Sequence, residues 1–447
     1  MSPSNASIVL VDGEHYPAVV ARAIAELKAS GEHPVLALMV GGKEKLGQAD
    51  ADLGIPVEIA GLDREAALAG AIERTGVKIV YDMSDEPVLG YVARCRLASV
   101  AIWKGAVYKG ADFEFSPPAR PSLAQGPSVA VFGTGKRCGK TSIAGAAARA
   151  FKTAGLQPVT VAMGRGGPAE PEVLKEGVDL SPQALYEFVK QGRHAASDYI
   201  EDALTARIPT VGAWRAGGGL AGAPGFGNYE AALRVAGGLR PGILILEGSG
   251  SAIPPVRSGA GVLAVDARID PGLVCGYFGL YRILLSDLIV LTMCEQSVDD
   301  RHLSDIERCI ASCTLNQPTL IRTVFRPFPL GEISNKKVWF ATTAAEEASN
   351  VLKHHLESRY GARVVGMTHA LADRPQLLED LKGAAGADAL VVELKAAAVD
   401  LVTRWGIEHE VEVIYSDNRP VVVGKQGSFD PEVMEVAELA QNRFESR

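Results

Sequence analysis

The feature that most constrains the fold is a glycine-rich turn between an apolar run and a helical pattern. Residues 128–132 read SVAVF, a short apolar run typical of a buried strand. Residues 133–141 read GTGKRCGKT, and after them a helical pattern predicts a helix from about 140 to 154. A strand, a glycine-rich turn and a helix in this order predict an α/β fold, with the turn at the carboxyl end of the strand.

The Gly-Lys-Thr at this junction indicates a phosphate-binding P-loop. In such a loop, backbone N–H groups surround the phosphates and the helix N-terminus adds partial positive charge. We expect Lys140 to reach the β- and γ-phosphates of a nucleotide, and the Thr141 hydroxyl to bind Mg²⁺. Five residues rather than the usual four separate Gly133 from Gly139. The alternative is a turn that binds no ligand. The predicted nucleotide-binding residues are Gly133, Thr134, Gly135, Lys136, Arg137, Cys138, Gly139, Lys140, Thr141 and Ser142.

Apolar runs alternate with helical patterns along most of the chain, which predicts βαβ units on parallel sheets. We predict a small Rossmann-like α/β domain at 1–115 and a proline-rich linker at 116–127. A large doubly wound, mostly parallel P-loop NTPase domain is expected at 128–425, followed by a helical tail at 426–447. Within the large domain, the run Asp417 to Pro420 is predicted to be a turn.

Composition and charge exclude several classes of protein. The chain has 447 residues, 47% of them hydrophobic and 22% charged, which is typical of a folded protein rather than a disordered one. A net charge of −8 argues against a nucleic-acid partner, although a local cation cluster can still bind a small anion. No apolar run approaches the roughly eighteen residues of a membrane-spanning helix. We therefore expect a cytoplasmic protein with no membrane partner.

The six cysteines form no CxxC motif. Cys309 and Cys313 are four residues apart, a spacing that predicts one helix face. A zinc site needs two more ligands, and only His302 lies near in sequence, so we expect no zinc site. The prediction is scattered, unpaired thiols in a reducing cytosol.

Two motifs resemble dethiobiotin synthetase and related ATP-dependent ligases. The first is the P-loop with its extra residue, and the second is the run 244–251, LILEGSGS. The apolar residues of this run place Glu247 at the carboxyl end of a strand, where doubly wound sheets bind ligands. We expect Glu247 to be a Mg²⁺ ligand, although it could also be an ordinary glutamate at a strand end.

Further runs extend the resemblance to nearly the whole chain. Residues 12–17 (DGEHYP), 163–168 (MGRGGP) and 194–199 (HAASDY), together with the P-loop, resemble the cyclic 2,3-diphosphoglycerate synthetase family. This resemblance implies that ATP and Mg²⁺ are used to close 2,3-bisphosphoglycerate into a cyclic pyrophosphate. Ligases of this branch are often dimers, so a homodimer is expected by analogy.

Such a reaction requires a site that holds several phosphates at once, with many N–H donors and several cations. Glycine-rich segments at strand exits supply the donors, and the lysines and arginines beside them supply the charge. The predicted catalytic residues are Lys136, Lys140, Arg165 and Glu247. The predicted substrate-binding residues are Arg165, Gly166, His194, Arg215, Gly218, Gly248 and Ser249.

Structural alternatives remain open for two of these side chains. Arg165 could pair with Glu170 or Glu172 just downstream, rather than bind a substrate phosphate. His194 and Asp198 are four apart in a helical pattern, so a surface contact on one helix face is as good an interpretation as a substrate contact.

Two other functions compete with the cyclase. One is a phosphoglycerate kinase that stops after a single phosphoryl transfer, and the other is a P-loop nucleotide switch. The guanine-binding pattern N-K-x-D is absent, since residues 335–338 read NKKV, which weakens a GTP switch. The acids Asp12, Glu14 and Asp82 follow predicted strands of the first domain, and their role is left open.

Overall fold

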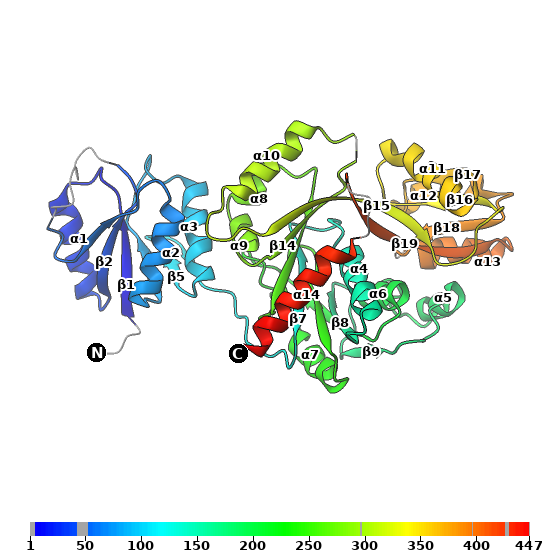
Figure 1. Ribbon diagram of the computed structural model, residues 1–447, viewed down its shortest axis with the longest axis horizontal. Helices are drawn as coiled ribbons and strands as arrows, with labels where there is room; N and C mark the ends of the chain where they lie inside the picture. Colours follow the sequence, from blue (N-terminus) through cyan, green and yellow to red (C-terminus); the bar gives the residue numbers. More distant parts are fainter. Residues whose placement is uncertain (1–4, 43–51, 296, 396, 425–428, 447) are drawn as a thin grey trace. The chain divides into compact units, whose positions relative to one another are not determined.

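The computed structural model divides into two compact units (Figure 1). No described helix is both long enough and apolar enough to cross a membrane. The first unit contains residues 1–119, 269–286 and 304–318, and the second contains 120–268, 287–303 and 319–447. The described residues are 5–42, 52–295, 297–395, 397–424 and 429–446.

The first unit is built on a six-stranded, mostly parallel sheet with the order β3-β2-β1-β4-β5-β6. The order reverses between β1 and β4, as in a Rossmann fold, so the Rossmann-like prediction is confirmed. Its elements are β1 (Ala6–Val11), α1 (Pro17–Ala29), β2 (His33–Met39), β3 (Val57–Ile59), α2 (Arg64–Thr75), β4 (Ile79–Asp82), α3 (Tyr91–Trp103), β5 (Val107–Lys109), β6 (Glu114–Phe115), α8 (Pro271–Cys275) and α9 (Gly279–Leu284).

Asp12 joins two strand ends at the point where the order of this sheet reverses. It is buried, and its Oδ1 accepts hydrogen bonds from the backbone N–H groups of Glu14 (2.9 Å) and His15 (3.1 Å). Its Oδ2 accepts a third from the N–H of Asp85 (2.8 Å), which follows β4. The Asp12 carboxylate therefore organises the loops after β1 and β4.

We expect Asp12→Asn to destabilise the protein by about 1–3 kcal/mol at pH 7, and by less in acid. Burial alone would raise the pKa of Asp12, but hydrogen bonds from His15, Asp85 and Glu14 outweigh it and lower the pKa. A lowered folded-state pKa stabilises the protein above about pH 4, and this stabilisation is lost as the pH falls through the folded-state value. Denaturant unfolding at pH 7 and at pH 3.5 measures the difference. An equal loss of unfolding free energy at both pH values would contradict the stabilising role of the charged Asp12 carboxylate.

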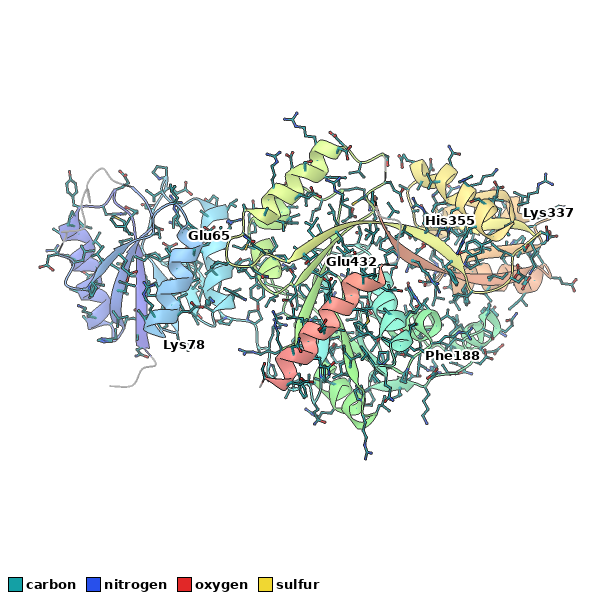
Figure 2. The ribbon with its side chains drawn as sticks, in the orientation of Figure 1. Glu65, Lys78, Phe188, Lys337, His355 and Glu432 are labelled. Carbon is teal, nitrogen blue, oxygen red and sulfur yellow. A yellow bond between two sulfur atoms is a disulfide. The ribbon has the colours of Figure 1, made fainter. Side chains whose placement is uncertain are left out.

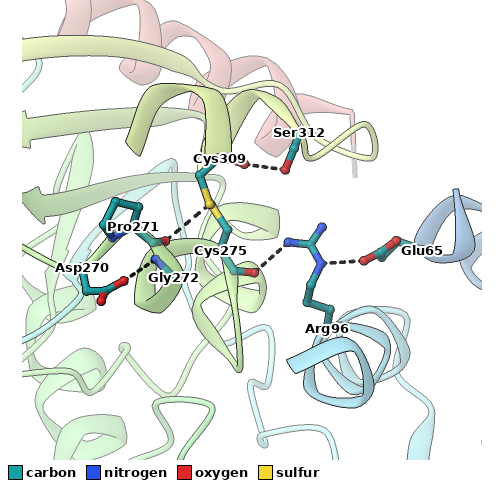
Figure 3. The surroundings of a disulfide bond; sticks show 8 residues. All are labelled: Glu65, Arg96, Asp270, Pro271, Gly272, Cys275, Cys309 and Ser312. Carbon is teal, nitrogen blue, oxygen red and sulfur yellow. Dashed lines mark hydrogen bonds and ion pairs between the residues drawn. A yellow bond between two sulfur atoms is a disulfide. The ribbon is translucent and has the colours of Figure 1, made fainter. Parts of the chain in front are cut away.

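A disulfide joins Cys275 on α8 to Cys309 on α10 (Asp300–Ala311) (Figure 3). The prediction of unpaired thiols is therefore wrong for these two cysteines. They are 34 residues apart in sequence, and only the packing of two separate helices brings them together. The shared helix face predicted for Cys309 and Cys313 is also wrong, because α10 ends at Ala311. The cysteines that are not in this disulfide are Cys95, Cys138, Cys294 and Cys313.

The second unit is built on one continuous sheet, with the order β11-β10-β8-β12-β7-β13-β14-β15-β19-β18-β16-β17 and with β9 paired to β10. The strands from β10 to β15 along this order are parallel. The elements of this part are β7 (Ser128–Gly133), α4 (Lys140–Thr153), β8 (Pro158–Gly164), β9 (Glu172–Leu174), α5 (Pro182–Lys190), α6 (Asp198–Ala206), β10 (Thr210–Ala216), β11 (Phe226–Gly227), α7 (Tyr229–Gly238), β12 (Ile243–Glu247), β13 (Ala260–Asp266), β14 (Leu288–Thr292) and β15 (Thr319–Pro329).

The central strands of this sheet are buried along their whole length, which explains their near-continuous apolar sequences. One core cluster is formed by α4, by α14 (Asp430–Glu445, marked by Glu432 in Figure 2) and by the strands that they cover. Phe151 of α4 and Val433 of α14 pack there with Val131 and Ile245. The apolar faces of these helices hold β7 and the glycine-rich turn that follows it in place.

β15 continues beyond the parallel strands and pairs antiparallel with β19, which leads into a second parallel group. The prediction of a turn from Asp417 to Pro420 is wrong, since these residues lie within β19. Their local turn preference is overridden by pairing with β15, where Arg419 is opposite Arg326. The predicted mostly parallel α/β class is confirmed. The remaining elements are β16 (Lys337–Ala341), α11 (Ser349–Tyr360), β17 (Arg363–Thr368), α12 (Arg374–Asp380), β18 (Ala389–Glu393), α13 (Arg404–Glu408) and β19 (Glu412–Val422).

Candidate active site

The glycine-rich segment between β7 and α4 closes around its own lysine. Lys140 is buried, and its Nζ donates a hydrogen bond to the carbonyl oxygen of Gly135 (2.7 Å). The same Nζ lies 3.5 Å from Cys138 Sγ. The Thr292 hydroxyl at the end of β14 donates to the carbonyl oxygen of Cys138 (3.1 Å), which ties the loop to the sheet. The ammonium group of Lys140 is thus held inside a turn of closely spaced backbone groups.

Two glycines of this loop have no room for a side chain. A Cβ at Gly139 would lie 2.3 Å from the Phe325 ring, and Gly139 has a φ of 83°, which favours glycine. A Cβ at Gly133 would lie 2.3 Å from Cys138 Sγ. The tight loop therefore depends on glycine at both positions. Beside these glycines the loop exposes two cations, Lys136 and Arg137, and the first turn of α4 adds the hydroxyls of Thr141 and Ser142.

Glu247, the last residue of β12, is fully buried beside the P-loop. Neither of its oxygens has a hydrogen-bond partner of good geometry, although Thr141 and Asp202 lie close to it. Burial, and then the charge of Asp198, raise the pKa of Glu247 to about 8. Burial and Glu247 likewise raise the pKa of Asp202, whose two oxygens also lack partners. Two buried, unpaired carboxylates require a proton or a cation, so this pair is a candidate cation site.

Sequence reasoning missed Asp202 and Lys395. Asp202 lies one helical turn after Asp198 on α6, and this spacing was the available signal. Lys395 follows β18, and its Nζ lies 3.0 Å and 3.2 Å from the two carboxylate oxygens of Glu201 on α6. The signal for Lys395 was its place just after an apolar run, the same criterion that identified Glu247.

Arg165 and Arg215 converge on the loop after β12. A Cβ at Gly250 would lie 2.8 Å from Nη2 of Arg215 and 3.0 Å from Nη2 of Arg165. Arg215 is buried and donates hydrogen bonds to the carbonyl oxygens of Gly217 (2.7 Å) and Ser249 (2.7 Å). Burial, and then the charge of Arg165, lower the pKa of Arg215. Two guanidinium groups that converge in this way form a candidate anion site.

Asp198 connects this anion site to the P-loop. Burial raises its pKa, while the charges of Lys140, Lys395, His194 and Arg215 all act to lower it. Because electrostatic interactions weaken with distance, Lys140 of the P-loop and the buried Arg215 both lie near the Asp198 carboxylate. The P-loop and the two converging arginines therefore form one site.

The remaining predicted substrate residues lie on the same loops. A Cβ at Gly166 would lie 3.0 Å from the His194 ring, and one at Gly218 would lie 3.8 Å from Nη1 of Arg215. Gly248 approaches the backbone closely, since a Cβ there would lie 2.4 Å from the carbonyl oxygen of Ala252. The structure thus brings these residues to the loops that carry the two arginines.

One sequence expectation here is wrong and one alternative is not observed. His194 and Asp198 do not share a helix face, because α6 begins at Asp198 and His194 lies in the preceding loop. Over the described residues, Arg165 forms no ion pair with Glu170 or Glu172. Glu172 instead pairs with Arg193 and accepts a hydrogen bond from the Tyr199 hydroxyl (3.0 Å).

Three family models match successive parts of the chain, all described as cyclic 2,3-diphosphoglycerate synthetase. They are its N-terminal domain (residues 6–116), its P-loop domain (128–324) and its C-terminal domain (329–419).

Curated relatives with the name "Cyclic 2,3-diphosphoglycerate synthetase" match at nearly full length. The relative from Rubrobacter xylanophilus is 45% identical over 94% of this chain and 96% of its own length. The relative from Thermococcus gammatolerans is 44% identical over 93% of each chain. The one from Methanothermobacter thermautotrophicus is 42% identical over 100% of this chain and 99% of its own. The resemblance predicted from the sequence motifs is confirmed: this ATP-dependent P-loop enzyme belongs to the cyclic 2,3-diphosphoglycerate synthetase family.

Proposed function

We propose that the enzyme closes 2,3-bisphosphoglycerate into cyclic 2,3-diphosphoglycerate, and that ATP is converted to ADP and phosphate. The observation that carries the proposal is the convergence of Arg165 and Arg215 near Gly250, in the same site as the P-loop lysine. A substrate with two phosphates needs cations beyond those that hold the nucleotide. The names of the relatives supply the identity of the substrate.

The proposed reaction has two steps. One substrate phosphate attacks the γ-phosphorus of ATP, and ADP leaves. The second substrate phosphate then attacks the phosphorus of the first, which is still attached to the glycerate, and inorganic phosphate leaves as the P–O–P ring closes. Lys140 and Lys136 stabilise charge on the nucleotide phosphates, while Arg165 and Arg215 hold the substrate phosphates close together.

The donors beside the P-loop fit a Mg²⁺ ion. The Thr141 hydroxyl and the unpaired carboxylate of Glu247 are hard oxygen ligands, and Asp202 adds a second carboxylate nearby. In the part of the chain that the structure describes, no three His, Cys, Asp or Glu side chains form a metal cage. Phosphate oxygens and water would complete the coordination, as Mg²⁺ prefers. When bound, Mg²⁺ would neutralise charge on the β- and γ-phosphates.

We further propose that the enzyme is a cytoplasmic homodimer. The dimer rests on the analogy with dethiobiotin synthetase-type ligases, and the location rests on the supply of ATP inside the cell. Sedimentation of the purified chain tests the first statement, and cell fractionation tests the second.

Phosphorus NMR of a reaction with ATP and 2,3-bisphosphoglycerate tests the proposed function. Paired pyrophosphate-type signals from a ring are the expected result. A new acyclic phosphate ester would favour the kinase alternative. ADP and phosphate without any new organic phosphate would favour the nucleotide switch, and either result would overturn the cyclase.

We expect Arg165→Lys to raise the KM for 2,3-bisphosphoglycerate about tenfold and to leave the KM for ATP nearly unchanged. Lysine keeps the charge but loses the planar fork that grips a phosphate through two hydrogen bonds. Initial-rate kinetics with each substrate varied in turn measure both constants. An increase confined to the KM for ATP would assign Arg165 to the nucleotide instead. Arg193→Lys, a change to an arginine that pairs with Glu172, is the matched control and should move neither constant.

A further inference from the structure

A cavity of about 420 Å³ opens at the end of α4 far from the P-loop. Its lining residues come from the C-terminal ends of α4 and α6 and from β15 and β19. From Lys140 to Lys152, α4 rises by about 18 Å, so this cavity is separate from the nucleotide site. Its volume lies within the range of small-molecule sites.

Four cations line the cavity, and none of its lining residues is acidic. The chain as a whole has a net charge of −8, so the positive charge of this lining is opposite to the net charge of the protein. Lysine or arginine near a helix C-terminus offsets the helix dipole, but Arg419 lies on a strand and has no such role. The four cations are Arg149, Lys152, Arg207 and Arg419.

Acidic side chains lie beside three of these cations, whereas none among the described residues pairs with Arg207. Nη1 of Arg149 and Nε of Arg419 both contact the same oxygen, Oδ2 of Asp417, at 2.9 Å and 3.3 Å. Asp430 and Asp202 act on Arg149 electrostatically as well. Lys152 pairs with Glu176, an exposed residue outside the cavity lining. For the Arg207 guanidinium, the described residues supply no hydrogen bond or ion pair.

The arrangement of these groups favours an anion with several oxygens. The Arg419 guanidinium stacks over the Phe328 ring, which holds its planar fork in one orientation. Arg149 is largely surrounded by protein, and burial lowers its pKa even though Asp417 opposes this effect. A partly buried guanidinium group that shares its carboxylate with a second one gains from a further negative charge.

We propose that this cavity binds a small molecule that carries two phosphate groups. Guanidinium forks bind phosphate through paired hydrogen bonds, and the cavity lining presents three such forks, more than one phosphate needs. Lys152 and Arg207 form the exposed entrance, while Arg149 and Arg419 form the inner wall. This inference does not depend on the proposed reaction, because none of these side chains belongs to the active site.

Isothermal titration of the full chain with inorganic pyrophosphate tests the proposal. One molar equivalent of pyrophosphate should bind to this cavity. Arg207→Gln should lower its affinity at least tenfold, and Lys152→Gln should lower the affinity of the same equivalent. Lys140→Ala should leave that equivalent intact, because it changes only the nucleotide loop. Orthophosphate should bind there more weakly than pyrophosphate.

Arg240→Gln is the matched control. Arg240, like Arg207, is an exposed arginine with positive φ, and it follows α7 by two residues, but it lies outside the cavity. It should leave pyrophosphate binding unchanged. The proposal is overturned if Arg207→Gln and Lys152→Gln bind pyrophosphate like the wild type, or if Arg240→Gln weakens binding equally. If orthophosphate bound as tightly as pyrophosphate, the proposal that the ligand carries two phosphate groups would be wrong.

Discussion

Lys140→Ala is expected to lower the rate of ATP turnover by about 10²-fold or more while the protein stays folded. The Lys140 ammonium lies inside the P-loop, where it donates to the Gly135 carbonyl oxygen and acts on the charge of Asp198. An alanine there removes the cation that stabilises charge on the transferred phosphoryl group. The substitution leaves the apolar contacts of α4 unchanged, and Phe151 still packs in the core.

Phosphate release from ATP and circular dichroism together measure these two effects. Lys175→Ala, which changes an exposed lysine of the same unit, is the control and should keep the wild-type rate. If Lys140→Ala consumed ATP like the wild type, the assignment of the loop to a nucleotide would be wrong. A loss of the circular dichroism signal would instead assign Lys140 a structural role.

Glu247→Gln is expected to raise the Mg²⁺ concentration for half-maximal activity at least about tenfold. The amide keeps the shape of the carboxylate but removes its charge from a hard-cation site. Glu393→Gln is the matched control, because Glu393 is also a buried glutamate at the end of a parallel strand. Its carboxylate is already satisfied by Thr343, whose N–H donates at 3.0 Å and whose hydroxyl donates at 2.8 Å. The control should leave the Mg²⁺ dependence unchanged.

The same substitution should also change how the stability of the metal-free protein depends on pH. Since the folded-state pKa of Glu247 is raised to about 8, the folded protein holds a proton that the unfolded chain releases above about pH 4.3. The wild type therefore loses stability as the pH rises from about 4.3 towards 8, and Glu247→Gln removes this loss. Unfolding at pH 5 and pH 8 in a chelator measures the effect. Identical Mg²⁺ dependence and identical pH profiles would make Glu247 an ordinary strand-end residue.

Local sequence was sufficient to predict the P-loop and the place of Glu247 at the end of a buried strand. Gly133 and Gly139 are needed where the backbone closes against Cys138 and Phe325, so the glycine pattern directly reflects the shape of the loop. An apolar run predicts a buried strand, and the residue at its end is placed at the ligand-binding edge of the sheet. Both inferences use only a few consecutive residues.

Local sequence was misleading where long-range pairing decided the outcome. The run Asp417 to Pro420 has turn-forming residues, yet it lies in β19 because β15 pairs with it. The disulfide between Cys275 and Cys309 depends on the packing of α8 against α10. Neither the strand pairing nor the disulfide can be predicted from the spacing of the residues along the chain.

The sequence by itself determined the alternation of strands and helices around the P-loop, the phosphate-binding loop itself and the family to which the chain belongs. The tertiary structure alone decided that Arg165 and Arg215 meet at Gly250, that Lys395 reaches Glu201, and that four cations surround one cavity. The physical reason is that periodicity and glycine placement act over a few residues of backbone. The convergence of side chains depends on the order of strands in the sheet, which is set by burial summed over the whole unit.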